Sequence, residues 1–412
     1  MRLLWLSHNV PYPPIGGVLQ RNYNLVKEVA SRHDVHLVAF NQKALLPTTA
    51  HLEDATKVLS QFCARVTILP IPSDASGFAW YALVIKSFLT EAPYTVNWLK
   101  SPTMRDKLRK VVAQSGFDLV HYDTISLAEY YDDTGAIPKV LNHHNVESAM
   151  MLRRARNEPN ILKKLYFYRE GKKLDVYERT LCPKYAANLV VSDREKHMLE
   201  QTIPGRKIEL VPNGVDTEYY CPGSGATLKH TLLFSGRLDS YSNRAGILFF
   251  LKRVWPHLKR QIPDVKLTVL GKNPPPVLQR VARREANVTV TGFVSDARPY
   301  FDAAELYICP LWDGGGTRLK ILDAMAMAKA VVSTSIGCEG IEVAPERNIL
   351  IANSPGEFIY QIRRVLHDPN LRMRLGREAR KLVTEKYAWS MIAKNLCNTY
   401  EALCRTPFLA GT

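Results

Sequence analysis

The sequence predicts an α/β protein with two doubly wound parallel sheets. Short runs of β-branched and apolar residues alternate with longer helical patterns almost throughout, which is typical of βαβ units. The length of 412 residues is enough for two domains that each bury a core. A Pro- and Gly-rich segment at 212–225 separates two such series. We expect domains at 1–210 and 211–388, and a C-terminal helix at 389–412 that returns to the first domain.

The expected strands form one series in each half of the chain. Each is a short apolar run bounded by turn residues. A capping box at Ser192 and Glu195, directly after one of these runs, predicts a helix from residue 193. The expected strands are 2–7, 34–40, 65–70, 118–122, 139–142, 188–192 and 207–211 in the first half, and 231–235, 266–270, 287–291, 305–310, 330–334 and 348–351 in the second.

Composition excludes several classes of protein. With 46% apolar and 23% charged residues the chain is neither disordered nor fibrous, although 55 Lys and Arg against 39 Asp and Glu give a net charge of +16. Seven scattered cysteines without a C-x-x-C pair favour a reducing compartment. The opening segment lacks the apolar core of a signal peptide, and the stretch at 78–89 is shorter than the roughly 20 residues that span a bilayer. We expect a cytoplasmic protein.

Ligands of doubly wound sheets bind at the carboxyl ends of the strands, so loops that follow strands are the candidate sites. In the first such loop, Gly16 and Gly17 let the backbone approach a ligand, and the amides of the following helix can hold an anion. The pattern differs from G-x-G-x-x-G, which disfavours a nicotinamide cofactor. A simple Pro-Gly turn is the alternative.

Two adjacent histidines, His143 and His144, follow the expected strand 139–142. An imidazole at a strand end can hydrogen-bond a sugar or stabilise a developing charge, and it titrates near neutral pH. Metal binding needs a third ligand, and no residue stands at a standard spacing. A structural role for either histidine stays open.

Two loops of the second half combine glycine with cations. Gly236 and Arg237 follow the strand 231–235, which suits a phosphate, although a surface turn would look the same. A stronger pattern lies where a strand passes through three glycines into a helix, because free amides and cations there form a diphosphate cradle. Asp323 can accept hydrogen bonds from ribose hydroxyls or form an ion pair with Lys320, one helical turn earlier. The members of this cradle are Gly314, Gly315, Gly316, Thr317, Arg318 and Lys320.

The ordered set of motifs resembles the retaining, nucleotide-sugar-dependent glycosyltransferases of family 4. These enzymes have the GT-B fold, in which two Rossmann-like domains face each other across the active site. The chain is most similar to sugar transferases of bacterial exopolysaccharide biosynthesis. The motifs are the Gly16-Gly17 opening, His144-Asn145-Val146-Glu147-Ser148, 211–216, 234–237, 290–293 and the Gly-rich loop that leads into a helix.

The resemblance implies a role for each candidate residue. The donor would be a UDP- or GDP-linked sugar, with its diphosphate on Arg237 and the segment 314–320 and its ribose on Asp323. Gly16 and Gly17 would close over the phosphates. The implied catalytic residues of this hexosyl transfer are His144, next to the transferred sugar, and the cations Arg237 and Lys320.

Two positions depart from the family pattern. Gly315 stands where the family has the first acid of its acidic-x7-acidic element, and the Lys that usually follows Arg237 is missing, with only Arg244 nearby. The missing acid leaves the identity of the sugar open. The chain also lacks Asp-x-Asp, so we expect neither a catalytic metal nor a cofactor, and Arg237 and Lys320 would stabilise the leaving diphosphate instead.

The positive charge is concentrated in one segment. Residues 151–180 contain nine Lys and Arg against four acids, interleaved with Leu, Tyr and Phe. Together with the apolar stretch 78–89, this pattern favours an anionic membrane surface on the inner face of the membrane and a glycan or lipid-linked acceptor. A solvated helix face is the alternative.

Two other functions are compatible with parts of the pattern. A GT-B protein can be a sugar-nucleotide epimerase, and a basic αβ protein can bind nucleic acid without catalysis. No nucleic-acid-binding module is recognisable in the sequence, so we expect no nucleic-acid partner.

Overall fold

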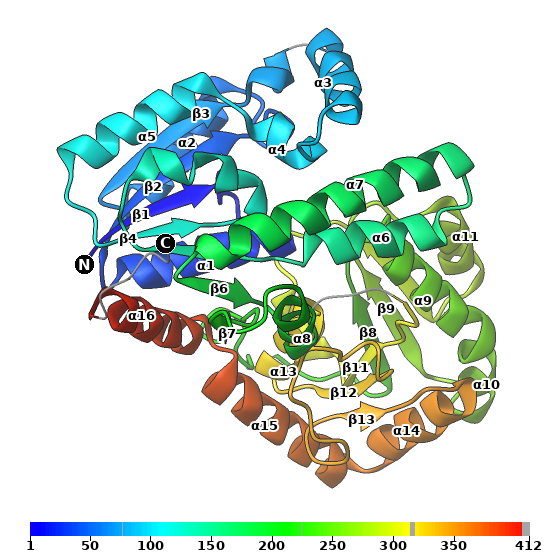
Figure 1. Ribbon diagram of the computed structural model, residues 1–412. Helices are drawn as coiled ribbons and strands as arrows, with labels where there is room; N and C mark the ends of the chain where they lie inside the picture. The colour runs from blue at the N-terminus through cyan, green and yellow to red at the C-terminus, as the bar shows by residue number, and fades with distance from the viewer. Residues whose placement is uncertain (76, 224, 314–317, 406–412) are drawn as a thin grey trace. The chain divides into compact units, whose positions relative to one another are not determined.

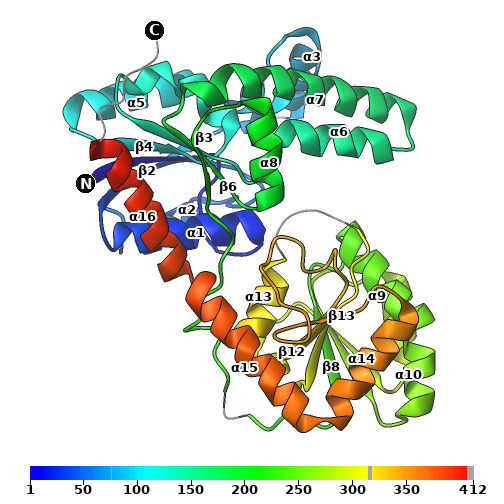
Figure 2. The ribbon, with the colours of Figure 1, turned by 60° about the horizontal axis from the view of Figure 1, so that its bottom comes forward.

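The computed structural model describes residues 1–75, 77–223, 225–313 and 318–405. It contains two compact units, one from Met1–Pro212 and Ile392–Thr412, the other from Asn213–Met391. Figures 1 and 2 show that each unit consists of a sheet with helices on both faces. Both sheets are parallel, so the expected α/β class with two Rossmann-like domains is confirmed.

The first unit has a seven-stranded sheet in the order β3-β2-β1-β4-β5-β6-β7. Its strands are β1 (Arg2–Ser7), β2 (Asp34–Asn41), β3 (Arg65–Pro70), β4 (Leu119–Tyr122), β5 (Lys139–Asn142), β6 (Ala187–Val190) and β7 (Ile208–Leu210). Its helices are α1 (Gly17–Ala30), α2 (Thr49–Leu59), α3 (Gly77–Leu89), α4 (Tyr94–Leu99), α5 (Pro102–Gln114), α6 (Glu147–Asn157), α7 (Ile161–Leu181), α8 (Asp193–Thr202) and most of α16 (Trp389–Arg405), with short 3-10 turns at Pro72–Ala75, Ile125–Tyr130, Asp132–Thr134 and Cys182–Lys184.

The central strands of this sheet are apolar on both faces because helices cover both. In β1, Leu4 and Leu6 join the core beneath α5, whereas Trp5 stacks on His121 of β4 on the opposite face. There Tyr400 of α16 lies beside His121, with its hydroxyl 2.6 Å from Nδ1. Figure 2 shows α16 next to α1 on this face of the sheet.

The second unit has a six-stranded sheet in the order β10-β9-β8-β11-β12-β13. Its strands are β8 (Thr231–Ser235), β9 (Lys266–Leu270), β10 (Val288–Gly292), β11 (Leu306–Cys309), β12 (Ala330–Ser333) and β13 (Leu350–Ile351). Its helices are α9 (Tyr241–Arg253), α10 (Trp255–Gln261), α11 (Pro276–Arg284), α12 (Arg298–Ala303), α13 (Leu319–Ala326), α14 (Pro355–His367) and α15 (Pro369–Lys386). A separate apolar core fills this unit, with Phe234, Phe250 and Phe358 among its largest fully buried side chains.

Each expected strand has its counterpart in the sheets; most ends lie within one residue of the expected position, and two are displaced by two residues. β6 ends at Val190, before the expected 192, because Ser192 leaves the sheet to cap α8. Its hydroxyl accepts a hydrogen bond from the backbone N–H of Glu195 at 3.3 Å, which confirms Ser192 as the N-cap and the expected helix start at residue 193. β13 is shorter than expected, since the Asn348 side chain accepts from the backbone N–H of Ala344 in the preceding turn.

The division between the units lies two residues beyond the expected position because of one buried arginine. The guanidinium of Arg21 in α1 donates to the backbone carbonyls of Val211 and Pro212, both at 2.8 Å. These contacts hold the end of the first segment in the first unit. At the other boundary, Trp389 donates its backbone N–H to the carbonyl of Val215, so the first residues of α16 stay with the second unit.

Within the described ranges, no helix combines the length and the apolar character that a membrane span requires.

Candidate active site

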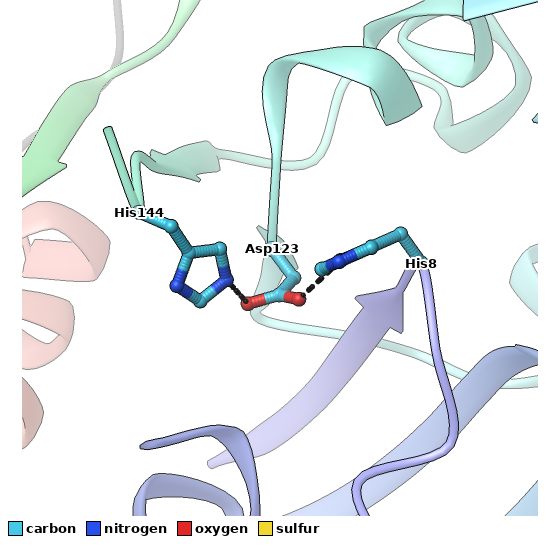
Figure 3. Close-up of side chains that lie close together, drawn as sticks. All are labelled: His8, Asp123 and His144. Atoms are coloured by element: carbon cyan, nitrogen blue, oxygen red, sulfur yellow. Dashed lines mark hydrogen bonds and ion pairs between the residues drawn. The ribbon is translucent and has the colours of Figure 1, made fainter. Parts of the chain in front are cut away.

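Three polar side chains meet where the order of the strands along the first sheet reverses. This switch point lies between β1 and β4, with β2 and β3 on one side and β5, β6 and β7 on the other, and doubly wound sheets bind ligands there. His8 follows β1, Asp123 follows β4 and His144 follows β5. Figure 3 shows both imidazoles pointing at the carboxylate of Asp123, with His8 Nδ1 at 2.9 Å and His144 Nε2 at 3.0 Å.

Asp123 is the centre of this network. Burial alone would raise the pKa of its carboxyl group, but the hydrogen bonds donated by His144 and His8, together with the positive charge that these imidazoles carry when protonated, hold that pKa well below its usual range. The amide of Asn22 donates to the same carboxylate at 2.6 Å, and that of Asn142 donates at 3.3 Å. Asp123 therefore stays ionised although its side chain is fully buried.

The hydrogen bonds also assign the protons of the two histidines. The amide of Asn9 lies 3.0 Å from Nε2 of His8 and donates to it, so the proton of His8 is on Nδ1 and points to Asp123. Burial lowers the pKa of His144, so its imidazole is neutral at neutral pH and donates from Nε2. Nδ1 of His144 is then an acceptor, suited to a sugar hydroxyl.

The same three residues form a cluster that could hold a metal ion. Among the described residues, one ligand atom from each of His8, Asp123 and His144 lies within 4.8 Å of the others. Both imidazole protons point to the carboxylate, however, and Asn22 and Ser7 donate to it as well. A metal ion would have to displace these hydrogen bonds. Metal independence of the protein stays a prediction.

The other candidate site residues of the first unit are a buried histidine with a structural role and two exposed glycines. His143 is buried, and its Nε2 lies 3.0 Å from the amide oxygen of Asn188, which gives it a structural role. Gly16 and Gly17 are exposed at the start of α1. Gly16 has φ +92°, a conformation that favours glycine, and a Cβ there would meet no atom within 4 Å.

In the second unit, the loop after β8 and the start of α13 come together at the corresponding switch point, between β8 and β11. Gly236 has φ +148°, and a Cβ on it would lie 2.8 Å from the Asn243 amide nitrogen and 2.9 Å from Lys320 Nζ. A Cβ on Gly271 would lie 1.8 Å from the carbonyl oxygen of Gly236. The loop is therefore held closely against α9, α13 and the end of β9.

Lys320, the second residue of α13, makes its direct side-chain contacts with neutral groups. Its Nζ donates to the side-chain oxygen of Asn243 at 2.5 Å and lies 4.5 Å from the centre of the Phe234 ring. Burial, aided by the charge of Arg318, lowers the pKa of Lys320 to about 8. An incoming phosphate would relieve the cost of burying this charge.

Arg237 and Asp323 are in contrasting surroundings. The guanidinium of Arg237 is exposed and forms an ion pair with Asp239 at 3.1 Å. Asp323 is deeply buried, which raises the pKa of its carboxyl group to about 8. Within the described part of the chain, its Oδ1 has no hydrogen-bond partner, and no ion pair joins it to Lys320. The helix ion pair considered from the sequence is thus not formed.

Four members of the expected diphosphate cradle, Gly314, Gly315, Gly316 and Thr317, lie outside the described residues. Arg318 is the residue that precedes α13. Sequence reasoning missed His8, Asp123 and Asn243. A usable signal existed for the first two, since each directly follows a strand.

Family comparisons match both units. A model described as "Glycosyltransferase Family 4" matches residues 15–219, and one described as "Glycosyl transferases group 1" matches residues 229–368. The chain belongs to glycosyltransferase family 4. The expected family is thereby confirmed, and the protein is a glycosyltransferase of the GT-B type.

Relatives of this family 4 protein are similar over most of their length. An "uncharacterized 44.6 kDa protein in cps region" of Klebsiella pneumoniae is 23% identical, covering 88% of this chain and 90% of its own. The alpha-D-kanosaminyltransferase of Streptomyces kanamyceticus is also 23% identical, covering 92% and 98%. Among solved structures, the sucrose-phosphate synthase of Thermosynechococcus elongatus has a TM-score of 0.68 at 17% identity, covering 98% and 99%. Anabaena HepE in complex with UDP has a TM-score of 0.66 at 14% identity, covering 98% and 100%.

Proposed function

We propose that this family 4 protein is a retaining glycosyltransferase that uses a UDP- or GDP-linked sugar. The acceptor is a hydroxyl group of a glycan or a lipid-linked sugar, and the reaction belongs to polysaccharide or glycoconjugate biosynthesis. The observation that carries the donor assignment is the arrangement around Gly236, where the buried cation Lys320 lies at the sheet switch point, on the same helix as the buried carboxyl group of Asp323.

Two comparisons support this proposal. The structure of HepE was solved in complex with UDP and with UDP-glucose, which favours a nucleotide sugar as donor. The relative from a cps region favours a role in a surface polysaccharide.

The chemistry follows from the charges that develop during transfer. When the bond between the sugar and the diphosphate breaks, negative charge grows on the diphosphate and the sugar becomes oxocarbenium-like. Lys320 and Arg237 stabilise the diphosphate, which would exchange the Arg237–Asp239 ion pair for a pair with phosphate. Asp323 accepts hydrogen bonds from the ribose. These cations replace a divalent metal, so we expect activity to persist in a chelator.

His144 is assigned to the transferred sugar. Its neutral imidazole accepts a hydrogen bond at Nδ1 from a sugar hydroxyl, while Asp123 holds the opposite nitrogen and contributes a buried negative charge. That charge stabilises positive character on the sugar in the transition state. The acceptor oxygen attacks the face that the diphosphate leaves, which retains the anomeric configuration.

The test is a panel of nucleotide sugars assayed for slow hydrolysis of the donor, because this identifies the donor without an acceptor. One UDP- or GDP-sugar should be hydrolysed, and the anomer released first, read by NMR, should match the donor. Lys320→Ala and Arg237→Ala should each reduce turnover at least tenfold. The matched controls are Lys381→Ala and Arg377→Ala, which remove exposed cations of α15. Unchanged turnover in both site variants would refute the assignment, and release of an epimer would favour the epimerase.

A further inference from the structure

The first unit has an exposed surface that is both apolar and basic, on helices that the proposed reaction does not use. Apolar side chains on one face of α7 lie open to solvent, and Ile161 is 74% exposed. Positions four, seven and fifteen residues later, Leu165, Tyr168 and Val176, are on the same helical face and are also exposed. A folded protein normally buries such a stripe against a partner.

A second stripe, on α3, joins the first. Tyr81, Ile85, Phe88 and Leu89 are exposed and recur at the spacing of one helical face, and Leu89 is 74% exposed. The guanidinium of Arg169 in α7 lies 4.9 Å from the centre of the Phe88 ring and donates to the Phe88 carbonyl at 3.0 Å. The two stripes therefore form one continuous surface, which we call the α3–α7 surface.

Along residues 161–173 of α7, the exposed charged side chains are all positive. Lys164 and Lys172 are exposed on the side of α7 that carries the apolar stripe, whereas the exposed Lys163 points to the opposite side of the helix. The one acid between residues 161 and 173 is Glu170, which is buried and forms an ion pair with Lys173 at 3.1 Å. An anionic partner would meet no opposing carboxylate on this part of the helix.

A groove runs between α6 and α7. Its volume is about 710 Å³, and its lining combines Leu152, Ile161 and Leu165 with the cations Arg156 and Lys164. The two helices pack tightly behind it, because a Cβ on Gly171 would lie 2.8 Å from Leu152 Cγ. The groove is thus a formed feature with an apolar floor and a cationic rim.

We propose that the α3–α7 surface binds an anionic phospholipid bilayer. Apolar side chains of α3 and α7 enter the interface between headgroups and acyl chains, and the lysines contact the lipid phosphates. The groove receives part of an acyl chain. A bilayer fits this surface better than a protein partner does, because its acyl chains match the long apolar stripe and its anionic headgroups match the adjacent cations. This inference does not depend on the proposed donor.

The test is co-sedimentation with phosphatidylcholine vesicles that contain about one third phosphatidylglycerol, compared with pure phosphatidylcholine. The charge variant is Lys164→Gln, Lys172→Gln, which removes the two exposed lysines on the side of α7 that carries the apolar stripe. At about fivefold for each lysine, its partition coefficient should fall by about 25-fold. The matched control, Lys43→Gln, Lys57→Gln, removes two exposed lysines elsewhere in the first unit and should bind like the wild type.

A second variant tests the apolar part. Ile161→Ser, Leu162→Ser, Leu165→Ser should also lose vesicle binding, and the binding that remains should be more sensitive to salt, since only the charge contribution is left. Equal pelleting of the charge variant and its control would overturn the proposal. So would a wild-type dimer in sedimentation velocity that the apolar variant converts to a monomer, because the surface would then join two chains. All readouts are made without a nucleotide sugar, so failure here leaves the proposed reaction untouched.

Discussion

The pKa of Lys320 should change when the diphosphate binds. Its environment in the free protein consists of Asn243, the Phe234 ring and the nearby charge of Arg318, none of which stabilises an ammonium as a phosphate would. A buried lysine with a pKa of about 8 is half neutral at mildly alkaline pH. Diphosphate binding favours the charged form and therefore raises this pKa.

The affinity for UDP or GDP should consequently depend on pH with a defined sign. Below pH 8 Lys320 is protonated before binding, and above pH 8 each unit of pH should weaken the affinity by up to about tenfold. Calorimetric titrations in buffers of different ionisation enthalpy should detect proton uptake near pH 8. Lys320→Arg keeps its charge throughout this range and should lose the pH dependence, even if it binds more weakly. The same slope in both proteins would contradict the assignment.

Asp123 is the residue whose loss should have the widest effect. In Asp123→Asn one oxygen becomes an NH₂ group, so the donors that now meet at the carboxylate lose acceptor capacity inside the protein. We expect a loss of about 2–4 kcal/mol in the free energy of unfolding and a fall in turnover of more than tenfold. Denaturant titration and the donor assay measure the two effects. Asp118→Asn, which alters a carboxylate bonded to the backbone of Arg2 outside this network, is the control.

At the scale of elements, the tight turn after β8 determines where Lys320 lies. Gly236→Ala would place a methyl group 2.8 Å from the Asn243 amide and 2.9 Å from Lys320 Nζ. The variant should displace Lys320, lower the affinity for UDP or GDP at least tenfold and destabilise the unit by about 1–3 kcal/mol. Gly292→Ala provides the comparison, since Gly292 also has a positive φ but no atom within 4 Å of an added Cβ. Equal affinity losses in the two variants would show that strain alone is responsible.

The elements themselves could be predicted from the sequence because each is a local pattern. Apolar runs bounded by turn residues predicted every strand, and Ser192 with Glu195 predicted the start of α8. The ends of strands were less predictable, because side-chain hydrogen bonds such as that of Asn348 compete with strand pairing.

The site could be predicted only in part, for a physical reason. Lys320 and Asp323 follow a conspicuous glycine loop, so a local pattern identifies them. The network of His8, Asp123 and His144 depends on β1, β4 and β5 being neighbours, and the order of strands in a sheet is not a local property. The role of Asn243 likewise depends on how α9 packs beside α13.

At the scale of the whole molecule, the chain crosses between the two units at Pro212–Asn213 and again within α16, after Met391. Each unit has its own sheet and its own core, so each should unfold as a cooperative body. Scanning calorimetry should then resolve two transitions. A ligand bound by only one unit should move only one of them, which provides a test of where the nucleotide binds.

UDP or GDP should raise the transition of the second unit much more than that of the first unit, which would contribute only the contact of Gly16 and Gly17 with the phosphates. At a ligand concentration of about 100 times Kd the gain is about 2.7 kcal/mol, or several degrees for a unit of this size. The converse perturbation is Tyr400→Phe, which removes the hydroxyl group that is hydrogen-bonded to the buried His121. This variant should lower the free energy of unfolding of the first unit by about 1–2 kcal/mol and should therefore lower only the first-unit transition. If the nucleotide raised mainly the transition that Tyr400→Phe lowers, the nucleotide site would lie in the first unit, and the roles of Lys320 and Asp323 would be wrong.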